Sequence, residues 1–128
     1  MSTYLRDLNS NSVRGASLIE GAQRTATANG SGVDLLSGDG LCTLELSNGV
    51  ITDGTHTITA QESDDNSTYT AVTLIQTLNA LTSSSTSGTV QFASFQRSKR
   101  YVRAVTTVSG TTTGGYYSVR FIEQKKSI

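Results

Sequence analysis

The sequence has no proline and no tryptophan, and it has one cysteine (Cys42) and one histidine (His56) among 128 residues. A single cysteine excludes an internal disulfide framework, and one histidine with one cysteine excludes a zinc site made of these ligands. Any bound metal would be a hard cation held by oxygen atoms. Because no apolar run is long enough to cross a bilayer and the N-terminus lacks a signal-peptide core, we expect a protein made in a cytoplasm, without membrane contact.

Serine and threonine together account for 38 residues, whereas hydrophobic residues make up 35% and charged residues 16% of the chain. Threonine favours strands, and serine, glycine and asparagine favour the turns between them. Without proline, tight turns depend on glycine and asparagine for positive φ angles, as at Asn48-Gly49 and Asp53-Gly54. The composition therefore predicts an all-β protein, and its length fits one domain.

Short runs of alternating apolar and polar residues lie between these turns. Clear examples are "LCTLELSN" over residues 41–48, "THTITAQE" over 55–62 and "RYVRAVTTV" over 100–108. Alternation of this kind predicts strands with one buried and one wet face. The residues expected to point inward are Cys42, Leu44, Leu46, His56, Ile58, Ala60, Val90, Phe92, Val102, Ala104, Tyr117, Val119 and Phe121.

The remaining segments determine how the strands connect. Residues 101–122 are expected to form a hairpin with a long glycine-rich connection. Residues 74–88 show helical spacing of leucines, which indicates either one helical turn or an irregular crossover between sheets. Residues 1–30 are interpreted as an extended N-terminal arm and a first strand, and residues 31–128 as a single β-sandwich domain.

The stretch "ESDDNSTY", residues 62–69, concentrates carboxylates. A calcium site needs about six to eight oxygen donors that converge on one ion, and the spacing here is not that of a helix-loop-helix calcium site. Adjacent Asp64 and Asp65 would point to opposite sides of an extended segment. Aspartate and asparagine readily cap the backbone amides of a turn, so we interpret the stretch as the solvated tip of a hairpin.

No other motif indicates catalysis. Two neighbouring carboxylates on a turn do not form the facing pair that a glycosidase needs. His56 alternates with threonines and is expected to be a partly buried strand residue rather than a general base. The segment 32–40, "GVDLLSGDG", lacks the lysine and the spacing of a phosphate-binding loop. We therefore expect no enzyme activity, no cofactor and no metal.

Charge is zero in total but uneven along the chain. Residues 1–96 carry three basic and nine acidic side chains, and residues 97–128 carry seven basic and one acidic. This asymmetry can steer docking, or it can be neutralised internally if the two parts pair in one sheet. The basic segment "RSKRYVR", residues 97–103, could contact an acidic protein, bind single-stranded nucleic acid or guard a strand edge. Neutrality of the whole chain argues against nucleic acid.

Four short motifs follow one another in the second half of the chain. They are "DGTHT" (53–57), "ESDD" (62–65), "KRYVR" (99–103) and "TTGG" (112–115), and a weaker match covers residues 24–35. In this order, over about residues 50–122, the chain resembles a family of small head proteins of tailed bacteriophages. The N-terminal arm and the "LCTLELSNG" strand depart from the family pattern.

The resemblance implies a capsid cement, or decoration, protein. Such a protein is a jelly-roll-like β-sandwich on the outer surface of the phage head, made in the cytoplasm of the bacterial host, and it ties neighbouring subunits of the major capsid protein together. The family also implies a homo-oligomer, with a trimer favoured over a dimer. The motifs assign no individual residue to a contact.

We predict that the arm and the basic segment contact the capsid or a sister subunit. The candidate interface residues are Tyr4, Leu5, Arg6, Asp64, Asp65, Arg97, Lys99, Arg100 and Arg103. One rival interpretation is a glycan-binding β-sandwich module of the virion, in which Tyr116, Tyr117 and the 62–69 turn would cradle a sugar. Another is a tail or neck structural protein, which differs only in its location on the virion.

Overall fold

The computed structural model of the chain describes residues 12–18 and 23–126. Its strands are β1 (Ser12–Leu18), β2 (Ala28–Asn29), β3 (Val33–Asp34), β4 (Gly38–Ile51), β5 (Thr55–Ser63), β6 (Thr70–Ala71), β7 (Val90–Gln96), β8 (Tyr101–Ser109) and β9 (Gly115–Lys125). The described residues contain no helix, and so none that could span a membrane. The expected all-β class is confirmed.

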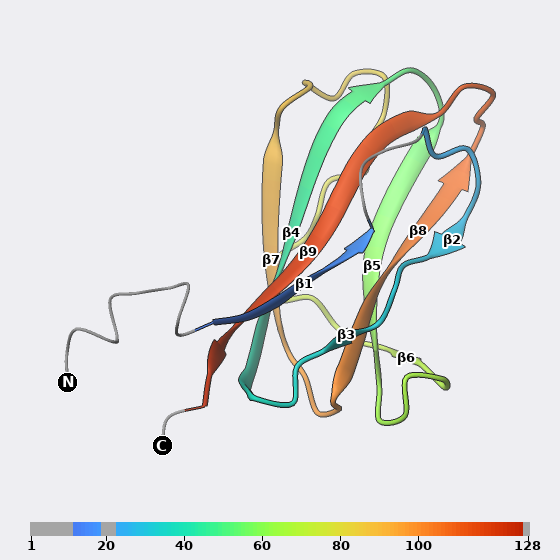
Figure 1. Cartoon of the computed structure of the whole chain (residues 1–128). Coiled ribbons are helices and arrows are strands. Elements are labelled where there is room, and N and C mark those ends of the chain that lie inside the picture. The colour runs from blue at the N-terminus through green and yellow to red at the C-terminus, as the bar shows by residue number, and fades with distance from the viewer. Residues whose placement is uncertain (1–11, 19–22, 127–128) are drawn as a thin grey trace.

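The strands form two antiparallel sheets that face each other (Figure 1). The first sheet has the order β1-β9-β4-β7, and the second has the order β2-β8-β5-β6 with β3 also paired to β8. Such a pair of facing sheets buries one side of each sheet in a shared core. The structure is consistent with the β-sandwich predicted from the alternating runs.

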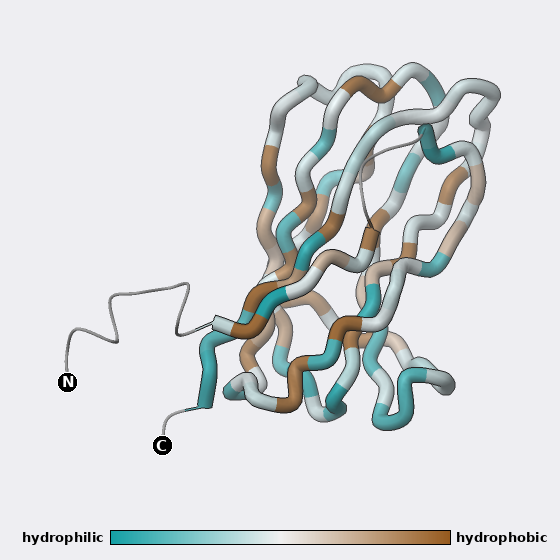
Figure 2. Tube along the Cα trace, viewed as in Figure 1, coloured by the Kyte–Doolittle hydropathy of each residue, from teal (hydrophilic) through white to brown (hydrophobic). Residues whose placement is uncertain are grey.

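Alternation along the strands builds the core, as Figure 2 shows by the change between hydrophobic and polar residues along the tube. Leu44 and Leu46 of β4 and Val119 and Phe121 of β9 are fully buried. Leu44 lies opposite Phe121 in the register, and Leu46 lies opposite Val119. The predicted inward faces of β4, β5, β8 and β9 are therefore confirmed.

The prediction for β7 is wrong by one residue. Val90 and Phe92 are exposed, at 45% and 58%, whereas Ala93 and Phe95 are fully buried. The register with β4 decides this, because Phe95 lies opposite the buried Cys42 and Phe92 lies opposite Glu45 on the outer face. Phe95 then packs edge to face against Phe121, with 6.0 Å between the ring centroids.

Residues 101–122 do not form the expected hairpin. β8 pairs with β5 in the second sheet, whereas β9 pairs with β4 and β1 in the first sheet. The connection between them crosses from one sheet to the other and is held by Asp53, whose carboxylate accepts hydrogen bonds from the backbone of Thr112, Thr113 and Gly114. Two strands that face each other across a core show the same alternation as two strands of a hairpin, so the pattern could not distinguish them.

Residues 72–81 are an irregular crossover that lies along the free edge of β7. The Ile75 amide donates to the Ser94 carbonyl at 2.8 Å, and the Gln76 side chain accepts from the Ser94 amide at 2.7 Å. Leu81 is buried and forms a bridge with His56 of β5. The leucine spacing thus reflects packing on the core, and the crossover protects an edge strand from pairing with other chains.

The expected early strand is β1, at the edge of the first sheet beside β9. The Ser17 hydroxyl connects β1 to the second sheet, because it donates to the Ser31 carbonyl at 2.7 Å and accepts from the Ala104 amide at 2.8 Å. Residues 1–11, which include most of the predicted arm, lie outside the described residues.

Candidate functional site

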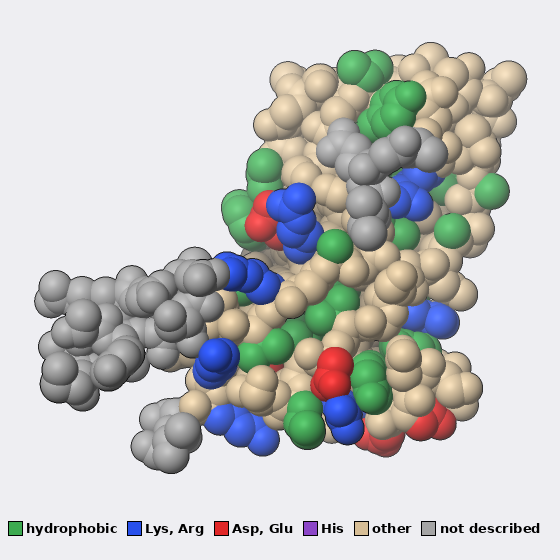
Figure 3. All heavy atoms as spheres, in the orientation of Figure 1, with side chains coloured by type: hydrophobic (Ala, Val, Ile, Leu, Met, Phe, Trp, Pro, Cys, Tyr) green, Lys and Arg blue, Asp and Glu red, His purple; other side chains and the backbone are tan. Residues whose placement is uncertain are grey.

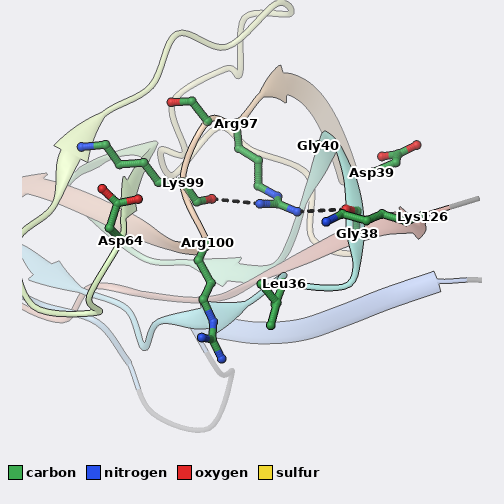
Figure 4. A pocket seen from close by; sticks show the side chains of 10 residues that line it. Leu36, Gly38, Asp39, Gly40, Asp64, Arg97, Lys99, Arg100 and Lys126 are labelled. Atoms are coloured by element: carbon green, nitrogen blue, oxygen red, sulfur yellow. Dashed lines mark hydrogen bonds between the residues drawn. The ribbon is translucent and has the colours of Figure 1, made fainter.

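Four of the predicted interface residues meet at one end of the sandwich. Asp64, Arg97, Lys99 and Arg100 line an open hollow of about 300 Å³ together with residues that include Leu36 and Lys126. We call this region the loop end, defined by residues 35–40, 62–69 and 96–100 and by Lys126. Figure 4 shows the hollow, in which the Arg97 side chain points between Lys99 and Gly38 and the Arg100 side chain points away.

Arg97 is held inside the protein by Glu123 of β9. The guanidinium Nη2 lies 2.6 Å from Glu123 Oε2, and the two side chains are 10% and 0% exposed. Arg97 also donates to the carbonyls of Leu35 at 2.5 Å and Lys99 at 3.0 Å. The hydrogen bond to Glu123 raises the pKa of Arg97 above its ordinary value. Almost all of its N–H groups are used within the chain, so Arg97 shapes the loop end and does not offer a charge to a partner.

The first three residues of β4, 38–40, are built around the Glu123 carboxylate. The Gly40 amide donates to Glu123 Oε2 at 3.1 Å, and Gly40 has a φ of 106°, which L side chains rarely adopt. A Cβ atom at Gly38 would collide with the same carboxylate. Two glycines therefore allow the backbone to close over a buried negative charge.

A second buried carboxylate holds the same basic segment from the other sheet. Glu62, at the end of β5, is 9% exposed and accepts hydrogen bonds from the Ser98 amide at 2.8 Å and the Ser98 hydroxyl at 2.9 Å. Glu123 belongs to the first sheet and Glu62 to the second. Residues 97–98 are thus fixed by one carboxylate from each sheet, which makes the adjacent Lys99 and Arg100 part of a preorganised surface.

Arg100 and Asp34 form an exposed bidentate pair at the rim. Nε lies 2.9 Å from Oδ1 and Nη2 lies 2.7 Å from Oδ2, with side chains 42% and 45% exposed. The hydrogen bond from Arg100 lowers the pKa of Asp34. The guanidinium also lies 5.0 Å from the centre of the Tyr101 ring. Arg100 is therefore oriented but still accessible.

Arg103 does not line the hollow. Its guanidinium lies over the Tyr69 ring, 4.0 Å from the centroid, and its Nε donates to Gln61 Oε1 at 2.9 Å. Burial raises the pKa of Tyr69, an effect that nearby Arg103 partly offsets. The side chain joins β8 to the 62–69 turn, and cation–π contact of this kind holds an arginine in one orientation.

The 62–69 turn is a hairpin tip, as predicted, because β5 pairs with β6 on its two sides. Asp65 Oδ1 accepts from the Ser67 and Thr68 amides, each at 2.9 Å. These bonds, led by that from Thr68, lower the pKa of Asp65. The neighbouring carboxylates diverge: Glu62 binds Ser98, Asp65 caps the turn, and Asp64 is exposed at the hollow.

His56 is fully buried rather than partly buried. Nε2 lies 3.0 Å from the Asp53 carbonyl oxygen, which can only accept, so Nε2 carries the proton. Nδ1 then accepts from the Tyr117 hydroxyl at 2.9 Å, and that hydroxyl also lies 2.6 Å from Thr106 Oγ1. Both ring nitrogens are engaged in the core, an arrangement that leaves the ring no lone pair for a substrate.

Folding brings together charges that are segregated in the sequence. Asp34 pairs with Arg100, and Glu45 lies 4.0 Å from Arg120, so each pair joins the acidic part of the chain to the basic part. In Figure 3 acidic side chains lie beside basic ones both over the first sheet and at the loop end. The loop end is therefore a surface of mixed charge rather than a uniformly basic patch.

Sequence reasoning missed two contributors to this site. Leu36 is 56% exposed at the rim of the hollow, and buried Glu123 binds Arg97, which lines the hollow. The signal for Glu123 was its position as the one acidic residue among the basic residues after residue 96. Tyr4, Leu5 and Arg6 lie outside the described residues.

No family model, no curated protein and no solved structure matches this chain.

Proposed function

We propose that this protein is a structural component of a tailed-phage virion, a capsid cement or decoration protein that binds the outer surface of the head and stabilises contacts between subunits of the major capsid protein. The observation that carries the proposal is the preorganised loop end. Buried Glu62 and Glu123 fix the basic segment from both sheets, so that Lys99, Arg100 and Leu36 are presented together.

A surface of this kind suits contact with a folded protein. Side chains that are ordered before binding lose little conformational entropy when a partner arrives. Exposed Leu36 supplies apolar area, and Lys99 and Arg100 supply charge that favours an acidic patch on the capsid. Modest contacts become strong when several copies act together, which is why we favour a homo-oligomer, a trimer rather than a dimer, on a repeating lattice.

The strand order supports the jelly-roll part of this proposal. Successive strands alternate between the sheets for much of the chain, which gives β1-β9-β4-β7 facing β2-β8-β5-β6. Such an alternation supports a jelly roll, an arrangement of two Greek keys that occurs in viral capsid proteins and also in lectin domains.

Occupancy on phage heads tests the proposal. Purified protein is added to heads that lack it, and bound protein is measured after sedimentation. Lys99→Glu with Arg100→Glu should reduce occupancy strongly, because both side chains are exposed or half-buried at the loop end and neither is part of the core. Thr57→Glu with Thr73→Glu adds charge to exposed positions outside the loop end and should leave occupancy unchanged.

Full occupancy of the loop-end variant, or no binding of the unmodified protein to heads, would contradict the proposal. Binding to tails or necks, but not to heads, would instead favour the rival structural role on the virion.

A further inference from the structure

The strand ends opposite the loop end (Figure 1) hold a second hollow, which has a volume of about 230 Å³. It lies where β4 ends and β7 begins, against residues 79–89, which lead from the crossover into β7. Its lining includes Asn48, Asn79, Ser85, Thr86, Thr89 and Gln91, and no lining residue is charged. We call it the amide hollow.

Asn48 leaves an unsatisfied acceptor at this hollow. The residue is 4% exposed, and its Nδ2 donates to the carbonyls of Gly49 and Thr86, each at 3.0 Å, which fixes the orientation of the amide. Its Oδ1 is buried and has no hydrogen-bond partner. Because a buried polar atom without a partner is costly, a donor from outside the chain, either a water molecule or a ligand hydroxyl, would stabilise this oxygen.

The other polar groups of the hollow are held in place but keep hydrogen-bonding capacity. The Gln91 carboxamide is bound to the backbone of Asn79 at both of its polar atoms, at 2.7 and 3.2 Å. The Thr89 hydroxyl donates to the Thr86 carbonyl at 2.7 Å and can still accept. The Ser85 hydroxyl accepts from the Thr82 amide at 3.0 Å and can still donate. The wall thus offers fixed donors and acceptors side by side.

We propose that the amide hollow binds one ring of a neutral carbohydrate, as a monosaccharide unit of a glycan. The lining has no charge to pair with an anion or a cation, and a sugar hydroxyl both donates, as Asn48 Oδ1 requires, and accepts. A water molecule takes about 30 Å³, so the hollow has room for several waters that the hydroxyls of one ring could replace.

This site differs from the one that the sequence suggested for a glycan. Tyr117 is fully buried, with its hydroxyl bound to His56 and Thr106, so it cannot form a sugar platform. The amide hollow is also remote from the loop end, and a protein seated on a capsid through its loop end would present this hollow away from that contact.

Amide chemical shifts of the full-length, isotope-labelled protein test the inference. Glucose, galactose, mannose and N-acetylglucosamine are each titrated to high millimolar concentration, with inorganic phosphate as the charged control. At least one sugar should give saturable shifts centred on Asn48, Thr86, Thr89 and Gln91, and phosphate should give none there. Absence of saturable shifts with every sugar, or shifts centred elsewhere, would overturn the inference.

Two variants with a matched control sharpen the test. Ala80 is exposed and lines the hollow, so Ala80→Trp should fill it and abolish the saturable shifts. As the matched control, Ala71→Trp places the same indole ring on exposed β6, and its affinity for the sugar should equal that of the unmodified protein. Thr86→Val removes one hydroxyl and should weaken binding about three- to tenfold. Unchanged sugar affinity in Ala80→Trp would contradict the proposal that the sugar binds in the amide hollow. If Ala80→Trp does not fold, unchanged sugar affinity in Thr86→Val would contradict it. Head occupancy is measured separately, so failure here does not affect the proposed function.

Discussion

Replacing Glu123 with glutamine tests whether the loop end depends on a buried ion pair. Glu123 is fully buried on its side chain, and its oxygens accept from Nε and Nη2 of Arg97 and from the Gly40 amide. Glutamine keeps the volume but removes the negative charge and places an N–H₂ group near the guanidinium. Removal of one partner of a buried pair costs about 3–5 kcal/mol, a large part of the roughly 5–15 kcal/mol that stabilises a typical domain.

Urea unfolding followed by far-ultraviolet circular dichroism measures this loss. With a slope of about 1–3 kcal/mol per molar urea, the midpoint of Glu123→Gln should fall by roughly 1–5 M. The double variant Arg97→Met with Glu123→Leu should recover part of the stability, because no buried charge is left unpaired. Recovery is incomplete because the Gly40 amide and the Leu35 and Lys99 carbonyls lose their hydrogen-bond partners.

The exposed pair on the first sheet provides the control. Glu45→Gln weakens a contact of 4.0 Å between partly exposed side chains and should cost less than about 1 kcal/mol. A loss of stability below about 1 kcal/mol for Glu123→Gln would refute the role given to the buried pair. The same holds if the double variant loses as much stability as the single variants Arg97→Met and Glu123→Leu lose in sum.

Two further predictions concern the register of β7 and the loss of stability in acid. Phe95→Ala should cost about 3–5 kcal/mol in urea unfolding, whereas Phe92→Ala should be nearly neutral; the reverse order would mean that β7 has the opposite phase. The Gly114 and Thr113 amides lower the pKa of Asp53, so its stabilising effect is complete above its unfolded pKa of about 3.9 and is lost as the pH falls through its lower folded pKa. Asp53→Asn should therefore flatten the decline of the urea midpoint below about pH 4, and parallel declines in both proteins would contradict this.

The alternation of apolar and polar residues correctly predicted which face of the long strands is buried. For β7 it predicted the wrong face. In residues 42–46 and 56–60 only one face of the strand is apolar, so only one orientation of the strand buries apolar side chains. In "VQFASFQ" both faces carry apolar residues, Val90 and Phe92 on one and Ala93 and Phe95 on the other. Pairing with β4 selects between them, and that information lies about 50 residues away in the sequence.

The sequence predicted several residues of the candidate site, but it did not predict how these residues are held in place. The sequence placed Lys99 and Arg100 in a basic segment and Asp64 at a turn tip, and the structure brings all three to one hollow. It could not show that the Arg97 side chain is only 10% exposed, because arginines are rarely so enclosed without a partner, and the partner Glu123 lies 26 residues away on β9. Such pairing depends on which strands become neighbours, and that is a property of the topology.

The connection of both sheets to residues 97–98 has a mechanical consequence. A pull applied to Lys99 or Arg100 reaches β9 through the Arg97 to Glu123 contact and β5 through the Ser98 to Glu62 contact. Both sheets share the pulling force, so the force does not make one sheet slide past the other. Under the proposed function, strain from a phage head that swells would reach the whole sandwich and not only one loop.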